Sequence, residues 1–371
     1  MSDAWLILAL ASGLRGRTLE TLLDRFGDAE HIVEASPSEL SAAGLSRPTL
    51  RQITDPDGRK LDLCHSWIAM DGHHAITLVD ERYPQLLREI TDPPTVLFAR
   101  GKIDALSLPQ FAIVGSRNAT PGGRETARRF ARYLAENGFC ITSGLALGID
   151  GAAHEGALDV GGSTVAVLGT GPDEIYPAAH EGLADRIADN GALITEFPPG
   201  SPVRRSHFPQ RNRLISGMTV GTLVAEAGRK SGALITARFA AEQGREVFAI
   251  PGSIHNPMAR GCHQLIRSGA KLVETGSDII EELPGLLAGL AESVKQNMAP
   301  NPPLADPGID PDYQRLLTFM GWDPVAVDTL IERSGLTAEE VSSMLLILEL
   351  EGHIDSLTGG RYLQRGKGRS K

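Results

Sequence analysis

Short apolar segments alternate with helical stretches between residues 110 and 275. The apolar segments are continuous runs, which is typical of strands buried on both faces of a parallel sheet. Parallel strands need a crossover between them, usually a helix, so the pattern predicts an α/β fold with an extended Rossmann-like, doubly wound and mostly parallel sheet. The predicted strands are residues 111–114, 139–142, 164–168, 192–195, 220–225 and 246–250.

Small and hydroxylated residues follow most of these strands. The carboxyl ends of parallel strands share one edge of a sheet, and small residues there let backbone amides approach a ligand. The sequence therefore predicts a shallow binding crevice along this edge. Asp150 and Thr170 are expected to satisfy turn amides. The candidate binding residues after the first three strands are Gly115, Ser116, Arg117, Asn118, Ser143, Gly144, Gly169 and Gly171.

The turn after the first strand leads into a helix at Pro121. Unpaired N–H groups and the positive end of the helix dipole converge at such a helix start, so the turn is predicted to bind a phosphate. Residues 115–120 do not match G-x-G-x-x-G, and no P-loop lysine follows, so a dinucleotide site is not expected. His154-Glu155 and His180-Glu181 lack the second histidine of a zinc motif, so we expect neither a metal nor a cofactor.

The charge distribution and the number of cysteines limit which binding partners and which cellular compartment the chain is expected to have. The net charge is −10, but residues 110–274 contain 17 Lys plus Arg against 15 Asp plus Glu, so the acidity belongs to the flanks. The local field decides binding, and net charge does not report it. The three cysteines form no C-x-x-C motif, which favours a reduced, cytoplasmic protein. No apolar run approaches about 18 residues, so no membrane contact is expected.

The densest basic stretch of the core, residues 204–213, contains one aromatic ring, Phe208. Guanidinium groups bind phosphates and a flat ring stacks on a base, so this combination suits a single-stranded nucleic-acid site. The alternative is that Phe208 fills the core and the arginines pair with Glu196 or Glu226. A later helix start offers a second anion-binding N-terminus. The candidates in these two segments are Arg205, Phe208, Arg211, Asn212, Arg213, Ser231, Gly232 and Thr236.

The 371 residues suggest two or three domains. Residues 1–72 are predicted to form a helical domain of helix-hairpin-helix or SAM-like type, or a packing module without nucleic-acid contact. Residues 73–292 would form the Rossmann-like domain, residues 293–311 a proline-rich linker, and residues 312–371 a winged-helix-like domain with a basic tail.

The predicted winged helix has helices at 313–320, 325–333 and 337–350 and a hairpin at 352–363. Its third helix carries no arginine or lysine, and a recognition helix that repels phosphate reads duplex DNA poorly. We therefore favour a protein contact or a regulatory role for this domain. The acidic residues on and next to that helix are Glu339, Glu340, Glu349 and Glu351.

Five ordered motifs over residues 75–275 resemble the DprA/Smf family of bacterial DNA-processing proteins. The resemblance implies that the chain binds single-stranded DNA, protects incoming DNA and hands it to the RecA recombinase during natural transformation, as a homodimer without catalytic activity. It also implies that Arg117 leads the phosphate contacts and that Arg205 and Phe208 supply a cation and a stacking ring. The motifs are Gly115-Ser116-Arg117, Ser143-Gly144 with residues 145–150, Phe208-Pro209-x-Arg211-Asn212-Arg213-x-Ile215-Ser216-Gly217, Ser231-Gly232-x-x-x-Thr236 and Pro251-Gly252.

Two other functions stay open on the same fold. The sheet and its crevice also resemble the lysine-decarboxylase-like phosphoribohydrolases, which cleave nucleoside monophosphates. Those enzymes carry Pro-Gly-Gly-x-Gly-Thr-x-x-Glu, whereas no glutamate follows Thr236 at that spacing here. Glu226 precedes the turn, where it would anchor a backbone amide or an arginine. A nucleotide sensor is the third alternative, because a mononucleotide would fit the same crevice.

Overall fold

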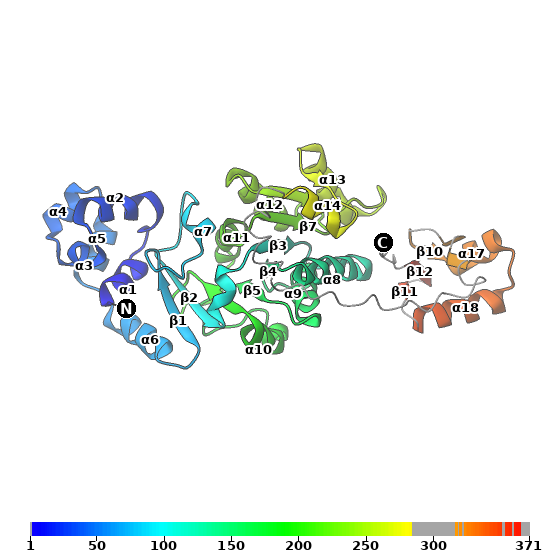
Figure 1. The fold of residues 1–371 in the computed structure, drawn as a ribbon, viewed down its shortest axis with the longest axis horizontal. Helices are drawn as coiled ribbons and strands as arrows, with labels where there is room; N and C mark the ends of the chain where they lie inside the picture. The colour runs from blue at the N-terminus through cyan, green and yellow to red at the C-terminus, as the bar shows by residue number, and fades with distance from the viewer. Residues whose placement is uncertain are drawn as a thin grey trace.

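The computed structural model of the chain describes residues 2–283, 316–317, 319–320, 323–350, 353–357 and 360–364. Within these residues a nine-stranded sheet forms the centre, in the order β1-β2-β6-β5-β4-β3-β7-β8-β9 (Figure 1). Neighbouring strands are parallel from β6 across to β9, and β2 pairs antiparallel with both β1 and β6. The strands are β1 (His73–Thr77), β2 (Val96–Gly101), β3 (Gln110–Val114), β4 (Cys140–Ser143), β5 (Thr164–Val167), β6 (Ala192–Thr195), β7 (Gly221–Val224), β8 (Glu246–Ala249) and β9 (Lys271–Leu272).

Helices cover both faces of this sheet, which confirms the predicted doubly wound α/β class. The first group of contacting helices is α8 (Pro121–Glu136), α9 (Ile149–Asp159) and α10 (Glu181–Asn190), with α14 (Gly276–Glu281) against α8. The second group is α11 (His207–Gly217), α12 (Ala233–Glu242) and α13 (Arg260–Arg267). The connections from β3 to β6 run one way across the sheet, and those from β7 onward run the other way. The carboxyl ends of β3 and β7 therefore form a topological switch point, where α/β sheets bind ligands.

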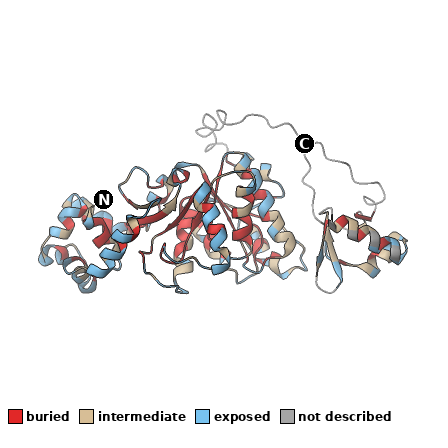
Figure 2. Cartoon of the chain, turned by 90° about the horizontal axis from the view of Figure 1, so that it is seen from below, coloured by how far each residue is buried: buried red, intermediate tan, exposed pale blue. Residues whose placement is uncertain are grey.

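The six predicted strands of the core are confirmed as β3 to β8 to within about two residues at each end. These strands are mostly buried, because helices lie on both of their faces (Figure 2). Short elements complete the connections: α7 (Gln85–Arg88), η1 (Ile103–Ser107), η2 (Ala178–His180) and η3 (Pro257–Ala259).

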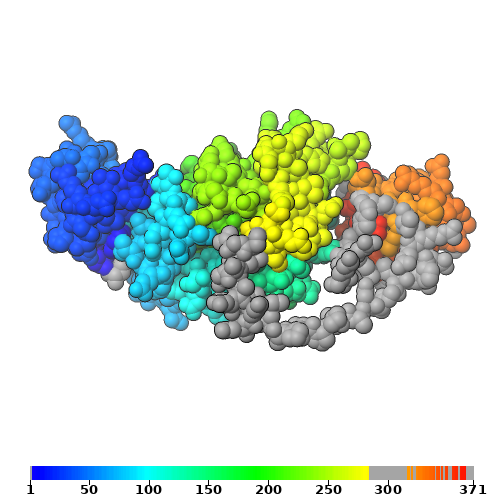
Figure 3. Space-filling view, turned by 45° about the horizontal axis from the view of Figure 1, so that its top comes forward, coloured from blue at the N-terminus to red at the C-terminus, as the bar shows by residue number. Residues whose placement is uncertain are grey.

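The N-terminal segment is helical, as predicted, and packs against the β1–β2 edge. One hydrophobic cluster runs from the first helix into β2, and the Thr95 hydroxyl donates to the Leu14 carbonyl at 2.8 Å. In the space-filling view these helices, in blue, contact the cyan segment that contains β1 and β2 (Figure 3). The helices are α1 (Asp3–Leu10), α2 (Gly16–Phe26), α3 (Ala29–Glu34), α4 (Pro37–Ala42), α5 (Arg47–Thr54) and α6 (Gly58–Ile68).

The C-terminal part contains the predicted helices and hairpin of a winged helix. Residues 316–317 and 319–320 are helical, and Thr337 and Glu340 form a capping box before α18. A short strand that the sequence analysis did not predict gives the sheet order β10-β12-β11. The predicted linker 293–311, Glu351 and residues 365–371 of the basic tail lie outside the described residues. The elements are β10 (Val325–Ala326), α17 (Val327–Ser334), α18 (Ala338–Leu350), β11 (Ile354–Leu357) and β12 (Arg361–Gln364).

None of the helices in the described part of the chain combines the length and the apolar composition that a bilayer span requires.

Candidate nucleic-acid interface

One cation and two aromatic rings meet at the carboxyl edge of the sheet. The guanidinium carbon of Arg117, just after β3, lies 5.4 Å from the centroid of the Phe208 ring in the first turn of α11. The Tyr176 ring lies 5.4 Å from the same ring, tilted by 54°. Arg117 and Tyr176 are exposed and Phe208 is half-buried. We call these three residues the rim cluster. The structure thus brings Arg117 and Phe208 together, as the predicted site requires.

The Phe208 ring packs closely against the backbone of Gly169. A Cβ atom on Gly169 would lie 2.8 Å from Phe208 Cδ1, so a side chain there would displace the ring. The preceding residue, His207, stacks on Phe197 with ring centroids 4.0 Å apart. Successive residues on a helix point in different directions, so the first turn of α11 offers Phe208 to the rim cluster and His207 to another side.

Backbone amides at the ends of β3 and β4 are taken by a carboxylate of the chain itself. Asp150, in the first turn of α9, accepts hydrogen bonds from the amides of Gly144 at 3.2 Å and Ala146 at 3.4 Å, and also from that of Gly115. Burial raises the pKa of Asp150, whereas Arg211 and these amides act in the opposite direction. The structural role predicted for Asp150 is confirmed. The amides of Gly115 and Gly144 are therefore engaged internally, which corrects the expectation that they face a phosphate.

The helix start of α8, where the sequence predicts a phosphate, holds the carboxylate of Glu226. Its Oε2 accepts the Thr120 amide at 2.8 Å and the Thr120 hydroxyl at 3.3 Å, and its Oε1 accepts from Asn256 at 3.3 Å. Gly123 leaves the room that this carboxylate occupies. The anion cradle exists, because the helix dipole and the free N–H groups favour a negative charge there, but an internal glutamate fills it.

Arg211 lies in the interior and is only 3% exposed. Its guanidinium donates to the carbonyl of Gly144 at 2.8 Å and to that of Val167, so it joins the ends of β4 and β5. Burial lowers the pKa of Arg211 to about 10, and the charge of Asp150 opposes that shift. In this arrangement the guanidinium cannot reach a phosphate. The predicted phosphate contact of Arg211 is thus corrected to a structural contact.

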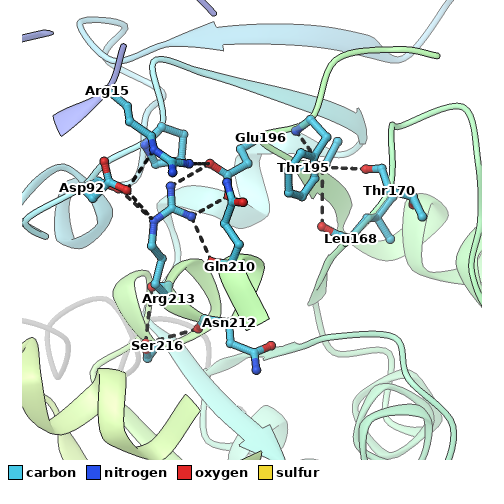
Figure 4. Close-up of polar contacts among 12 residues, drawn as sticks. Arg15, Asp92, Leu168, Thr170, Thr195, Glu196, Gln210, Asn212, Arg213 and Ser216 are labelled. Atoms are coloured by element: carbon cyan, nitrogen blue, oxygen red, sulfur yellow. Dashed lines mark hydrogen bonds and ion pairs between the residues drawn. The ribbon is translucent and has the colours of Figure 1, made fainter. Parts of the chain in front are cut away.

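Arg213 is also turned inward, into a cluster of two arginines and two carboxylates (Figure 4). Its Nη1 and Nη2 lie 2.5 and 2.7 Å from the two oxygens of Glu196, and the two side chains are 8% and 7% exposed. Asp92 lies 3.3 Å from Arg213 and 3.1 Å from Arg15, which also reaches Glu196 at 3.4 Å. Arg213 thus pairs with Glu196, which is the alternative to phosphate binding that the sequence analysis left open. We call these four residues the ion cluster.

The ion cluster joins parts of the chain that are far apart in sequence. Arg15 precedes α2 in the N-terminal helices, Asp92 precedes β2, Glu196 follows β6, and Arg213 lies in α11. Charge-assisted, bidentate contacts of this kind fix both distance and orientation. The cluster therefore holds the N-terminal helices against the helix that carries Phe208.

The remaining predicted residues divide between interior and surface. Ser143 is buried and donates to the Ile113 carbonyl at 2.6 Å, and Thr236 is 1% exposed, so neither faces solvent. Four others bond within the chain: Ser116 to the Asn118 amide, Gly171 to Ser201, Asn212 to Gly232, and Ser231 to Ala233. These contacts are structural. The Thr170 hydroxyl donates to the Glu174 carbonyl, so it satisfies a turn carbonyl and not the turn amide that the sequence predicts. The residues left with exposed side chains or backbone are Asn118, Arg205 and Gly232.

The sequence analysis did not identify Tyr176. This residue is 44% exposed and belongs to no helix or strand. The available signal was an aromatic side chain in the loop after the third predicted strand, at the same sheet edge as Phe208. Only the fold shows that this loop returns to the first turn of α11.

Known proteins similar to this chain cover almost all of it. Residues 74–284 match the family model described as DNA recombination-mediator protein A, and residues 299–360 match the DprA winged helix domain. Protein Smf from Escherichia coli is 39% identical over 97% of this chain and 95% of its own length. DNA processing protein DprA from Streptococcus pneumoniae is 47% identical over 56% of this chain and 73% of its own length.

Two solved structures share the fold. That of DNA processing protein A from Streptococcus pneumoniae covers 76% of this chain and 98% of its own, with a TM-score of 0.68 and 37% identity. That of DNA processing protein A from Helicobacter pylori, described for its single-stranded DNA binding mode, covers 57% of this chain and 96% of its own, with a TM-score of 0.52 and 29% identity.

Proposed function

This chain belongs to the DprA/Smf family of DNA recombination-mediator proteins, and from that premise we propose that it binds single-stranded DNA along the carboxyl edge of its parallel sheet. The rim cluster is the observation that carries this proposal. A guanidinium beside two accessible aromatic rings combines the charge and the stacking surface that single strands require. The Helicobacter pylori relative, described as binding single-stranded DNA, supports the same ligand here.

A base would stack on Phe208 or Tyr176 and the adjoining phosphate would meet Arg117. Stacking on the face of Phe208 would replace the guanidinium that lies over that ring here, and the freed guanidinium would remain within reach of the backbone. Arg205 and Asn118 are the exposed polar neighbours in the same two loops. Because Asp150 and Glu226 occupy the turn amides, side chains rather than backbone groups would hold the phosphates.

We propose a binding protein rather than an enzyme. A phosphoribohydrolase needs a carboxylate free to assist cleavage, but both oxygens of Glu226 accept hydrogen bonds from Thr120 and Asn256. Asp150 is likewise committed to three turn amides. These commitments support a site whose acidic groups maintain the fold.

We further propose that the protein acts in the bacterial cytoplasm as a homodimer, protects incoming DNA and hands it to the RecA recombinase during natural transformation. The family description as a recombination mediator supports this role. We propose that the winged helix contacts protein rather than DNA, because its third helix, α18, carries no lysine or arginine that could bind a phosphate.

Electrophoretic titration of the purified protein with labelled oligonucleotides tests the proposal. We expect retention of single-stranded DNA at protein concentrations that leave a duplex of the same length free. A parallel assay of nucleoside-monophosphate hydrolysis should give no product. Equal affinity for duplex, or hydrolysis that Phe208→Ala abolishes, would overturn the proposed function.

A further inference from the structure

A cleft lies between the N-terminal helices and the central domain, next to the rim cluster. It has a volume of about 570 Å³, which is within the range of ligand-binding clefts, about 300–1,000 Å³. Arg15, Lys60 and Leu63 line one wall, and Phe197, Arg204 and His207 line the other. The two walls are close together where Leu63 faces Gly200. A Cβ atom added to Gly200 would lie 3.3 Å from Leu63 Cδ1.

The cleft and the rim cluster are two sides of the same helix start. Phe208 contacts Tyr176 and Arg117 on one side of the first turn of α11, whereas His207 and Gln210 line the cleft on the other. The ion cluster lies at the cleft, since Arg15 and Glu196 both line it. A strand leaving the rim cluster across this turn would therefore enter the cleft directly.

The chemistry of the cleft matches a polyanion with flat, partly apolar groups. Lys60 and Arg204 are exposed cations on opposite walls. Lys60 forms an exposed ion pair with Asp57 at 3.8 Å, and such a surface pair is weak enough for a phosphate to compete with it. Glu196 is the acidic group of the far wall, and Arg213 and Arg15 both bind it. The Phe197–His207 stack, the prolines of the loop after β6 and Leu63, 49% exposed, supply apolar surface.

We propose that this cleft is a second subsite for the same single strand, so that the N-terminal helical domain takes part in DNA binding. The inference rests on the proposed function, because it extends the strand that the rim cluster holds. Lys60 and Arg204 bind phosphates from the two walls, and the sugar and base edges lie against Leu63 and the Phe197–His207 stack. The charges on both walls and the continuity with the rim cluster favour nucleic acid over a peptide.

Oligothymidylates of two lengths test the subsite, one of about 5 and one of about 15 nucleotides, which lie near the lower and upper ends of known single-strand site sizes. The double variant Lys60→Ala/Arg204→Ala should bind the long oligonucleotide about tenfold more weakly at low salt. Its salt slope for the long oligonucleotide should flatten by about 1.4, for two phosphates at about 0.7 each. Affinity for the short oligonucleotide should not change. The matched control is Arg59→Ala/Lys102→Ala, which removes two exposed cations that do not line the cleft.

A fluorescence measurement complements the loss of affinity expected for the double variant. Leu63→Trp places an indole on the cleft wall, and we expect the long oligonucleotide to quench its fluorescence while the short one does not. An equal loss of affinity for both lengths, or no loss for either, would overturn the subsite. Failure of wild-type protein to bind either length would instead overturn the proposed function, so the two outcomes are distinguishable.

Discussion

The guanidinium carbon of Arg117 lies 5.4 Å from the centroid of the Phe208 ring, although the two residues belong to separate halves of the doubly wound sheet. Arg117 follows β3, the first strand of one half, and Phe208 lies in the first turn of α11, the crossover into the other half. The contact therefore lies at the edge where the chain reverses its direction across the sheet. Neither side chain is enclosed, so both remain available to a ligand.

Replacement of the Phe208 ring tests the stacking surface. Phe208→Leu keeps an apolar side chain against Gly169 but removes the flat ring, and we expect single-strand binding to weaken by about 1–3 kcal/mol. The loss should be similar for oligothymidylate and oligoadenylate, because every base has a stacking face. Fluorescence anisotropy titrations measure it, with Leu108→Ala as an exposed apolar control. Unchanged affinity would remove the ring from the site.

Arg117 is expected to contribute one phosphate contact. In Arg117→Ala the plot of log affinity against log salt should flatten by about 0.7 for a single strand. Arg132→Ala, which removes an exposed arginine that pairs with Glu136 further along α8, is the control and should leave the slope unchanged. Equal slopes for wild type and Arg117→Ala would show that this guanidinium does not meet a phosphate.

The buried pair of Arg213 and Glu196 is expected to affect stability more than binding chemistry. Without Arg213 the buried Glu196 is left with the longer contacts to Arg15 and Gln210, both at 3.4 Å, so Arg213→Met should cost about 3 kcal/mol of unfolding free energy. The double variant Arg213→Met/Glu196→Leu should recover most of that loss, since no charge is then stranded. Urea denaturation followed by circular dichroism measures both. If the double variant were as unstable as the single one, packing rather than charge would explain the effect.

His154 should make stability depend on pH. Its Nδ1 lies 2.7 Å from the Thr164 hydroxyl, which donates to the Ile141 carbonyl at 2.6 Å, so Nδ1 must carry the proton. In the described part of the chain Nε2 is buried with no partner, and burial lowers the pKa of His154 from 6.5 to about 3.

Because the pKa of His154 is lower in the folded protein than in the unfolded chain, the free energy of unfolding should fall as the pH falls. The unfolded chain protonates His154 as the pH falls below 6.5, but the folded protein does so only near pH 3, so this stabilisation is complete above 6.5 and is lost at about 1.4 kcal/mol per pH unit below it. His154→Leu should reduce the slope of unfolding free energy against pH between about 6 and about 4. Urea titrations at several pH values measure the slope. His255→Gln, at an exposed histidine, should not change it, and an unaltered slope in His154→Leu would contradict the assignment.

Local signals in the sequence were sufficient to predict the helices and strands of the core and the α/β fold class. Continuous apolar runs identified β3 to β8, and the helix predicted to begin at Pro121 is α8, which begins at that residue. These signals are readable because strand burial, helix periodicity and capping depend on residues a few positions apart. The order of the motifs along the chain likewise indicated the DprA/Smf family.

The direction of each charged side chain was decided only by the tertiary structure. Arg205, Arg211 and Arg213 look equivalent in the sequence, but the first is exposed while the other two are buried against strand-end carbonyls and Glu196. Glu226 fills the cradle that the turn after β3 offers to an anion, although 106 residues separate it from Thr120. An anion-binding turn attracts any carboxylate that the fold brings near it, and a local sequence pattern does not specify which one arrives.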